Sequence, residues 1–398
     1  MSQEKFVFVV CGAKEHVETL NFSLQYLRHF SKKDILVVTD SRRNEAPIKH
    51  DQVIDLHTPD EYDHKQASIY LKTGLHKFLD SGPDYCYLDS DIIAVSPKVD
   101  KIFQYKSGPV TFASDHCTID KFSPQALNCS CRQEQEAKAR QLEKLDQQWK
   151  DEHGLKDQRL LDRLHRLEYL LDRLSELKQK GGVVSLIKRS LIDRKINRNY
   201  YFNIEADQWW DKDENLLYDK KNDYIEYIEA RSRFHFDKSV WFWRDTDERP
   251  IFSFACNHLV EEIKQKEGSY ITDPNWQHWN GGVFLFDEAS NEFLDYWHEL
   301  TLKMFDDPFW KTRDQGTLAA SAWQFGLQDQ PRIPREFNFI ADYYGWEHQY
   351  LGDFTFSEED NGQKIKPHFL HIYHEFGNQE WSLWQDVEQL LQLQPTFD

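Results

Sequence analysis

Residues 85–95 constrain the fold of this chain most, because two carboxylates, Asp89 and Asp91, interrupt an otherwise apolar run. The run predicts a buried strand, and two carboxylates are costly to bury without a positive partner. Side chains two residues apart point the same way on a strand, and a kink at Ser90 would let both carboxylates reach one cation. Such oxygen ligands suit Mg²⁺ or Mn²⁺, which commonly share their coordination with substrate phosphates. The segment therefore favours a nucleotide diphosphate ligand; the alternative is a helix cap or a loop salt bridge at a strand end.

Composition narrows the class of protein. The chain has 398 residues, 39% of them hydrophobic, which is enough for one large domain or two ordinary ones. A net charge of −19 argues against general nucleic-acid binding, because that depends on a basic surface. The sequence has no apolar run of about eighteen residues, so we expect no transmembrane helix.

The cysteines and the start of the chain indicate the compartment. Six cysteines fit buried thiols, and the first residues lack a signal-peptide pattern, so we expect a cytoplasmic protein. Cys129-Ser130-Cys131 lacks the two-residue spacer and the second pair that are typical of a zinc site. We therefore predict no metal at that pair.

Strands and helices alternate in the first part of the chain. Expected strands at 5–11, 34–39, 52–56, 85–95 and 109–113 are interleaved with expected helices at 15–30 and 64–79. This order predicts an α/β fold with a mostly parallel sheet and helices on both faces, in which ligands bind beyond the carboxyl ends of the strands. Those ends bring Cys11, Gly12, Asp40 and the two carboxylates of the 85–95 segment around one crevice.

The pattern changes in the middle of the chain. Residues 128–250 predict a largely helical, aromatic insertion between a first half at 1–127 and a second half at 251–398. Leucines spaced by four and three residues between 160 and 174 form a helix seam. Residues 183–198 are basic and amphipathic, which fits peripheral contact with an anionic membrane or an acidic acceptor, or else a helix packed on the body with a solvated charged face. After 250 we expect helices at 257–266, 290–305 and 313–325 and strands at 278–287 and 368–373.

Two polar motifs in the second half could meet the carboxylates. Asn280 is followed by Gly281 and Gly282 at the start of an apolar strand, where missing side chains allow a close approach to the backbone; the motif could equally be a turn before the strand. Asp314 and Gln315 open a helix, and they either cap it or hydrogen-bond substrate hydroxyls.

Histidines and lysines supply further candidates. His371 and His374 lie at the end of a strand, and either could be a third ligand of an ion such as Mn²⁺. Lys65 and Lys72 are two helical turns apart and would face the same side, where they could neutralise a diphosphate or be ordinary surface lysines.

Five motifs in this order resemble the family-8 glycosyltransferases, which are retaining enzymes that include glycogenin and the lipopolysaccharide galactosyl- and glucosyltransferases. The resemblance covers about residues 1–115 and 270–380. The matching segments are Tyr87-Leu88-Asp89-Ser90-Asp91, Asn280-Gly281-Gly282-Val283, Asp314-Gln315, Ile333-Pro334-Arg335-Glu336-Phe337-Asn338 and His374-Glu375-Phe376-Gly377.

The resemblance implies a GT-A type fold, a Rossmann-like mixed sheet flanked by helices that binds a nucleotide sugar. It also implies that Asp89, Asp91 and His374 hold Mn²⁺ (or Mg²⁺) against a UDP-sugar, with Val10, Cys11 and Gly12 near the uridine. Ser90, Gly281, Gly282 and Gly377 would line the donor. Gly316 stands where the family has a second aspartate, and the lysine expected after Gly377 is missing, so Lys65 or Lys72 would have to supply its charge.

The implied reaction is transfer of a hexosyl group to a hydroxyl of a glycan, a lipid-linked saccharide or a protein. With retention, Gln315 and Asn280 would position the substrates, whereas inversion needs a base, for which Asp314 is the candidate. Two alternatives stay open: a non-catalytic glycan-binding or scaffold protein, and a sugar-nucleotide pyrophosphorylase. The insertion at 128–250 is the segment we expect to select the acceptor.

Overall fold

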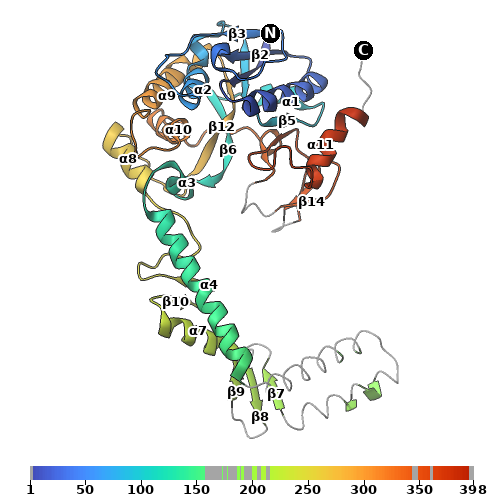
Figure 1. Ribbon diagram of the computed structural model, residues 1–398, viewed down its shortest axis with the longest axis vertical. Helices are drawn as coiled ribbons and strands as arrows, with labels where there is room; N and C mark the ends of the chain where they lie inside the picture. Colours follow the sequence, from blue (N-terminus) through green and yellow to red (C-terminus); the bar gives the residue numbers. More distant parts are fainter. Residues whose placement is uncertain are drawn as a thin grey trace. The chain divides into compact units, whose positions relative to one another are not determined.

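The chain forms two compact units, one of which interrupts the other. The computed structural model describes residues 3–156, 173, 177, 186–188, 190–191, 200–203, 208–211, 216–342, 348–358 and 362–393. Residues 1–129 and 255–398 make the first unit, and residues 130–254 make the second (Figure 1).

A six-stranded sheet forms the centre of the first unit. Its strands, in spatial order, are β3 (Val53–Asp55), β2 (Asp34–Thr39), β1 (Glu4–Val10), β4 (Asp84–Leu88), β12 (Gln277–Phe286) and β6 (Val110–Thr118). β12 runs antiparallel to both its neighbours, and the other five strands share one direction. The predicted mixed α/β fold is therefore confirmed.

Helices cover both faces of this sheet. One face packs against α1 (Lys14–Phe30), which in turn contacts α11 (Ser382–Leu393). The other packs against α2 (His64–Thr73), α3 (Ile119–Ala126), α8 (His258–Glu267), α9 (Asn291–Lys303) and α10 (Arg313–Gln324). Phe6 and Phe8 of β1 enter the first core, and Val7 and Val9 enter the second. Burial on both faces explains why the strand sequences are continuously apolar.

The expected single strand at 85–95 is wrong. β4 ends at Leu88, and β5 (Ile92–Ala94) belongs to a second sheet, in the order β13 (Phe339–Ile340), β17 (Phe369–His371), β5. The two carboxylates therefore lie in the link between two sheets, beyond the carboxyl end of β4. Smaller elements of this unit are β14 (His348–Tyr350), β15 (Phe356–Glu358), β16 (Lys364–Ile365) and the short helices η1 (Ser41–Arg43), η2 (Leu75–Lys77), η3 (Val99–Tyr105), η4 (Glu288–Ser290) and η5 (Arg335–Phe337).

The second unit is not only helical. It contains α4 (Cys131–Lys156), α7 (Lys220–Arg231), an antiparallel sheet of β7 (Tyr200–Asn203), β8 (Gln208–Asp211) and β9 (Leu216–Asp219), and the pair β10 (His235–Asp237) and β11 (Phe242–Arg244). Its core joins Leu142 and Trp149 of α4 to Ile228 and Trp243. The predicted largely helical insertion thus missed two small sheets.

Several predicted features of the insertion fall outside the described residues. The leucine seam between 160 and 174 is one of them. Of the basic segment 183–198, only 186–188 and 190–191 are described, and Leu186, Ile187 and Leu191 there are exposed. In the part of the chain that the structure describes, no helix combines the length and the apolar character needed to cross a membrane.

Candidate active site

Backbone hydrogen bonds fix the Asp89–Asp91 link on several sides. The Asp89 N–H donates to the Gly282 carbonyl at 2.8 Å, and the Asp91 carbonyl accepts from the Ile372 N–H at 3.2 Å. The Ser23 hydroxyl donates to the Ser90 carbonyl at 2.6 Å. The link is therefore held between β12, the segment after β17 and α1, which orients both carboxylates.

His371 at the end of β17 faces these carboxylates. β17 pairs with β5 so that His371 lies opposite Ile92, one residue from Asp91. Its Nε2 is 3.3 Å from Asp91 Oδ1, and its Nδ1 is 2.8 Å from Asn338 Oδ1. Because an amide oxygen only accepts, Asn338 places the proton on Nδ1 and leaves Nε2 directed at the carboxylate.

The donor set fits a divalent cation. Asp89, Asp91 and His371 each offer a ligand atom, and these atoms lie within 4.8 Å of one another. Asp91 Oδ1 and His371 Nε2 are buried and make no hydrogen bond among the described residues. Buried polar atoms are rarely left without a partner, and two oxygens with one imidazole suit Mn²⁺ or Mg²⁺. Burial lowers the pKa of His371, but Asp91 and Asp89 outweigh burial and raise it overall.

His374, the ligand implied by the resemblance, lies elsewhere in this conformation. Its side chain is exposed, and its backbone N–H donates to Asp342 Oδ2 at 2.5 Å. Asp342 also accepts from the N–H groups of Tyr373 and Glu375, at 3.0 and 2.8 Å. This carboxylate turns the chain directly after β17, so the geometry favours His371 over His374.

Two glycines of β12 leave room for these side chains. Opposite β6, Asn280 pairs with Ala113 and Phe284 with Phe112, so the intervening residues bulge out of the ladder. A Cβ on Gly282 would lie 2.8 Å from Asp89 Oδ2, from His371 Cε1 and from Asn280 Oδ1. Bulges of this kind re-aim strand residues beside active sites.

A buried carboxylate that the sequence analysis missed, Asp115 of β6, organises the amide side chains. Gln315 Nε2 donates to Asp115 Oδ2 at 2.7 Å and to the Trp279 carbonyl at 2.6 Å, and its Oε1 accepts from the Gly281 N–H at 3.0 Å. Asn280 Nδ2 lies 3.4 Å from the same carboxylate oxygen.

Further contacts complete this network. Asn280 Nδ2 also donates to the Tyr373 hydroxyl at 2.8 Å, while Asn280 Oδ1 accepts from the Gly282 N–H at 2.9 Å. Burial raises the pKa of Asp115, but contact with His116 outweighs burial and lowers it overall. In this network Asn280 and Gln315 chiefly hold the β12 bulge in place.

Lys72 is the cation inside the site. Its Nζ is 3.2 Å from Asp89 Oδ1 and 3.4 Å from Asp314 Oδ2. Burial lowers the pKa of Lys72, but the two carboxylates raise it overall, so the ammonium stays charged. Tyr87 donates its hydroxyl to Asp89, and burial holds the pKa of this phenol well above its usual value. The buried Lys72 ammonium thus lies between two acidic groups of the site.

Lys65 and Gly377 are not brought to this cluster. Lys65 is exposed, and its Nζ lies 3.4 Å from the Lys311 carbonyl. Gly377 is exposed in a turn, with φ of +84°.

The end of β1 leads into Gly12, which contacts a residue of a separate cavity. Gly12 has φ of +116°, and a Cβ there would lie 2.8 Å from His64, so glycine is required. Its N–H donates to Asn44 Oδ1 at 3.1 Å. Asn44 also helps to line a cavity of about 410 Å³ together with Thr39, and this volume lies within the range of small-molecule sites. Burial raises the pKa of Cys11 to about 11, so its thiol is neutral at physiological pH.

Comparisons with known proteins find likeness among solved structures only. No family model matches the chain, and no curated protein is similar enough in sequence to match. The bifunctional glycosyltransferase WbbM (apo) matches at 10% identity and a TM-score of 0.41, over 99% of this chain and 50% of WbbM, so the chain spans half the length of that protein. The galactosyltransferase LgtC, in complex with donor and acceptor sugar analogues, matches at 9% and 0.38, over 98% and 96%. Mouse xyloside xylosyltransferase 1 (apo) matches at 8% and 0.36, over 95% and 98%. Likeness at this level does not bear on function, which is inferred below from the residues of the site.

Proposed function

We propose that this chain is a divalent-metal-dependent glycosyltransferase of the family-8 type, which moves a hexosyl group from a UDP-sugar to an acceptor hydroxyl with retention. The observation that carries the proposal is the convergence of Asp89, Asp91 and His371, with two buried atoms, Asp91 Oδ1 and His371 Nε2, that lie 3.3 Å from each other and make no hydrogen bond among the described residues. The motifs that resemble family 8 supply the donor class.

The proposed cation ligands are Asp89, Asp91 and His371, so His371 takes the role that the resemblance gave to His374. Asn338 fixes the imidazole so that Nε2 faces the site. A cation bound there would act as a Lewis acid that neutralises charge on the departing diphosphate.

Lys72 supports the same charge balance. Its ammonium is held between Asp89 and Asp314, one of which is a proposed cation ligand. With Asp89 bound to a cation, the Lys72 ammonium would be available to a phosphate oxygen of the donor. Lys72 therefore stands in for the lysine that the motif after Gly377 lacks. The uridine is proposed to bind beside Gly12, next to the cavity that Asn44 helps to line.

Retention is favoured by how the other polar side chains are used. The side-chain amides of Gln315 and Asn280 hydrogen-bond the backbone of the β12 bulge, which fits a positioning role. Asp314, the candidate base for inversion, is paired with Lys72. The sugar carbon would pass through an oxocarbenium-like state, with the departing phosphate oxygen accepting the acceptor's proton.

Calorimetric titration with UDP, with and without Mn²⁺, tests the site. We expect binding that requires Mn²⁺ in the natural protein and that is lost in Asp91→Ala and His371→Ala. His374→Ala is the matched control and should bind as the natural protein does. A screen of UDP-sugars for hydrolysis, followed by NMR of the product anomer, then tests transfer and retention.

Each outcome decides between alternatives. Loss of binding in His374→Ala, with binding kept in His371→Ala, would restore the ligand set implied by the resemblance. Well-folded protein that binds no UDP would reject the UDP-sugar donor. Metal-independent glycan binding that survives Asp91→Ala would favour the non-catalytic binder.

A further inference from the structure

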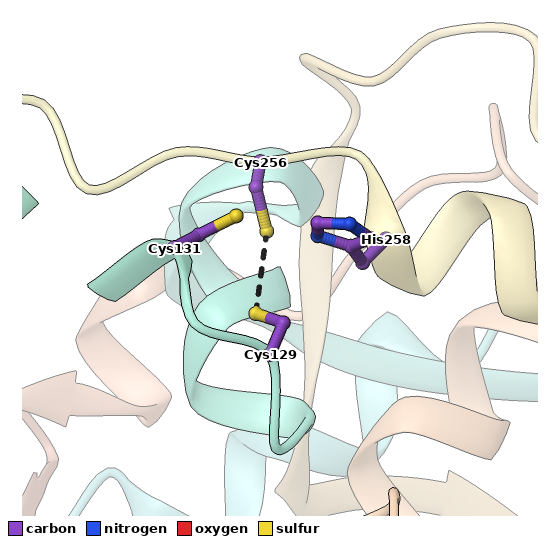
Figure 2. Close-up of side chains that lie close together, drawn as sticks. All are labelled: Cys129, Cys131, Cys256 and His258. Carbon is purple, nitrogen blue, oxygen red and sulfur yellow. Dashed lines mark hydrogen bonds between the residues drawn. The ribbon is translucent and has the colours of Figure 1, made fainter. Parts of the chain in front are cut away.

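A second group of metal-binding side chains lies apart from the proposed active site. It consists of Cys129, Cys131, Cys256 and His258, whose ligand atoms lie within 4.8 Å of one another. Figure 2 shows the three sulfurs and the imidazole pointing toward one another from the segments 129–131 and 256–258. The second pair that the sequence around Cys129 lacks is thus supplied from a distant part of the chain.

We propose that these four residues bind one structural Zn²⁺ ion. Three thiolates and one imidazole form a donor set that structural zinc sites use, and soft sulfur ligands select zinc over Mg²⁺ or Mn²⁺. All four protein ligands are present, so no open position is left for substrate water, as expected of a structural site. Each thiol that binds the ion releases its proton to solvent.

The sulfur separation fits this ion better than it fits a disulfide. Cys129 Sγ and Cys256 Sγ are 3.9 Å apart. Sulfurs about 2.3 Å from a tetrahedral zinc ion would be separated by about 3.8 Å. A disulfide would need about 2.05 Å between the same atoms.

Neighbouring groups orient the ligands. Ser123, which is fully buried, accepts the Leu259 N–H on Oγ at 2.9 Å, and the same Oγ lies 3.1 Å from Cys256 Sγ. The hydroxyl hydrogen is therefore available to the sulfur, an arrangement that suits a thiolate acceptor. The Cys256 N–H donates to the Asp120 carbonyl at 2.9 Å, which fixes the backbone at the same ligand.

The position of the ligands in the chain indicates a structural role for the site. Cys129 is the last residue of the first unit before the insertion, and Cys256 follows directly after the chain returns to that unit at Ala255. Cys131 is separated from Cys129 by one residue and is the first residue of α4. A zinc ion here would cross-link the two points at which the chain leaves and re-enters the first unit. Such a cross-link closes the long loop formed by the insertion. It thereby lowers the conformational entropy of the unfolded chain and stabilises the fold.

Elemental analysis of the full-length protein, purified from zinc-containing medium under reducing conditions without chelator, tests the proposal. We expect about one zinc ion per chain in the natural protein and loss of most of it in Cys129→Ser and Cys256→Ser. Ser130→Ala, from the same turn, is the matched control and should keep its zinc. Asp91→Ala should also keep it, which separates this site from the proposed active site.

A second measurement covers variants that fold poorly. Exchange of the natural protein's metal for Co²⁺ should give the intense visible absorption of a tetrahedral thiolate site, and chelation of zinc should lower Tm. Well-folded protein that contains no zinc and takes up no Co²⁺ in this form would overturn the proposal, as would full zinc content in both cysteine variants. A disulfide between Cys129 and Cys256 that persists in the presence of reductant would overturn it as well. It would be seen as the loss of two of the six free thiols.

Discussion

Gly282 offers the sharpest test of the proposed cation site, because an added methyl group would meet the ligands themselves. In Gly282→Ala the new Cβ would lie 2.8 Å from Asp89 Oδ2, from His371 Cε1 and from Asn280 Oδ1, whereas ordinary contact begins at 3.4 Å. Each of these atoms must therefore retreat by 0.6 Å (3.4 minus 2.8). Metal–ligand distances tolerate only about 0.2 Å, so the ligand set should no longer close around one ion.

The expected magnitudes differ for binding and for stability. We expect Mn²⁺ affinity to fall by more than about tenfold, since loss of a supporting contact alone costs about 10–100-fold. Overpacking should lower the free energy of unfolding by only about 1–3 kcal/mol, so the variant should stay folded. The loss of the signal of free Mn²⁺ in electron paramagnetic resonance measures affinity, and urea denaturation measures stability.

Gly281→Ala is the matched control on the same strand. Its Cβ would crowd Gln315 Oε1 at 2.8 Å, the end of a flexible side chain, and would touch Lys72 Nζ at 3.6 Å. It meets none of the proposed ligands, so Mn²⁺ affinity should be nearly unchanged. If folded Gly282→Ala bound Mn²⁺ as the natural protein does, the assignment of the site to Asp89 and His371 would be refuted.

Three further substitutions test the surroundings of the site. Asn338→Ala removes the partner of His371 Nδ1, at 2.8 Å, and should weaken Mn²⁺ binding about 10–100-fold in the same titration. Lys72→Met leaves the carboxylates of Asp89 and Asp314 without their cation. Urea denaturation should show a free energy of unfolding lower by about 1–3 kcal/mol, a figure reduced because both carboxylates are partly exposed. Saturating Mn²⁺ should restore part of this loss. Asp40 is fully buried, and burial raises its pKa, but hydrogen bonds from Arg42 and from a threonine hydroxyl lower it overall. The ionised form of Asp40 therefore stabilises the fold above about pH 4, and this contribution is lost as the pH falls further. Asp40→Asn should accordingly lower the free energy of unfolding most at neutral pH and less in acid. Urea denaturation at the two pH values measures this difference.

These three expectations can each fail in a distinct way. Unchanged Mn²⁺ affinity in Asn338→Ala would mean that the orientation of His371 does not matter for the ion. A destabilisation of Lys72→Met that Mn²⁺ does not relieve would separate the lysine from the cation site. A pH-independent deficit in Asp40→Asn would show that packing, and not the ionised carboxylate, is responsible.

The sheet and helices of the first unit could be predicted from the sequence. Its central strands are buried on both faces, and its helices carry apolar residues at helical spacing, so both signals are local. The single strand expected at 85–95 failed because Ile92–Ala94 are as apolar as the strand before them. Apolar character predicts burial, but it does not tell which sheet a strand joins.

Asp115 shows how a site residue was lost through a misplaced strand end. The expected strand stopped at Ala113, whereas β6 continues to Thr118. From Ala113 to Thr118 buried residues alternate with half-buried ones, and Asp115 is one of the buried residues. A carboxylate in such an alternation demands partners, and this was the signal that could have revealed the contact with Gln315.

The proposed metal ligands mark the limit of sequence reasoning, because their identity depends on contacts between distant segments. His371 and His374 are equivalent candidates in the sequence, and the choice between them follows from pairing of β17 with β5, which sets His371 beside Asp91. The pair at Cys129 has no local partner, and its partners come from a segment that follows the whole insertion. In both places the local sequence contains candidate ligand residues, while strand register and the return of the chain decide which of them meet. Substitutions in matched pairs, one residue inside the geometric cluster and one beside it in sequence, are for this reason the most direct test of both sites.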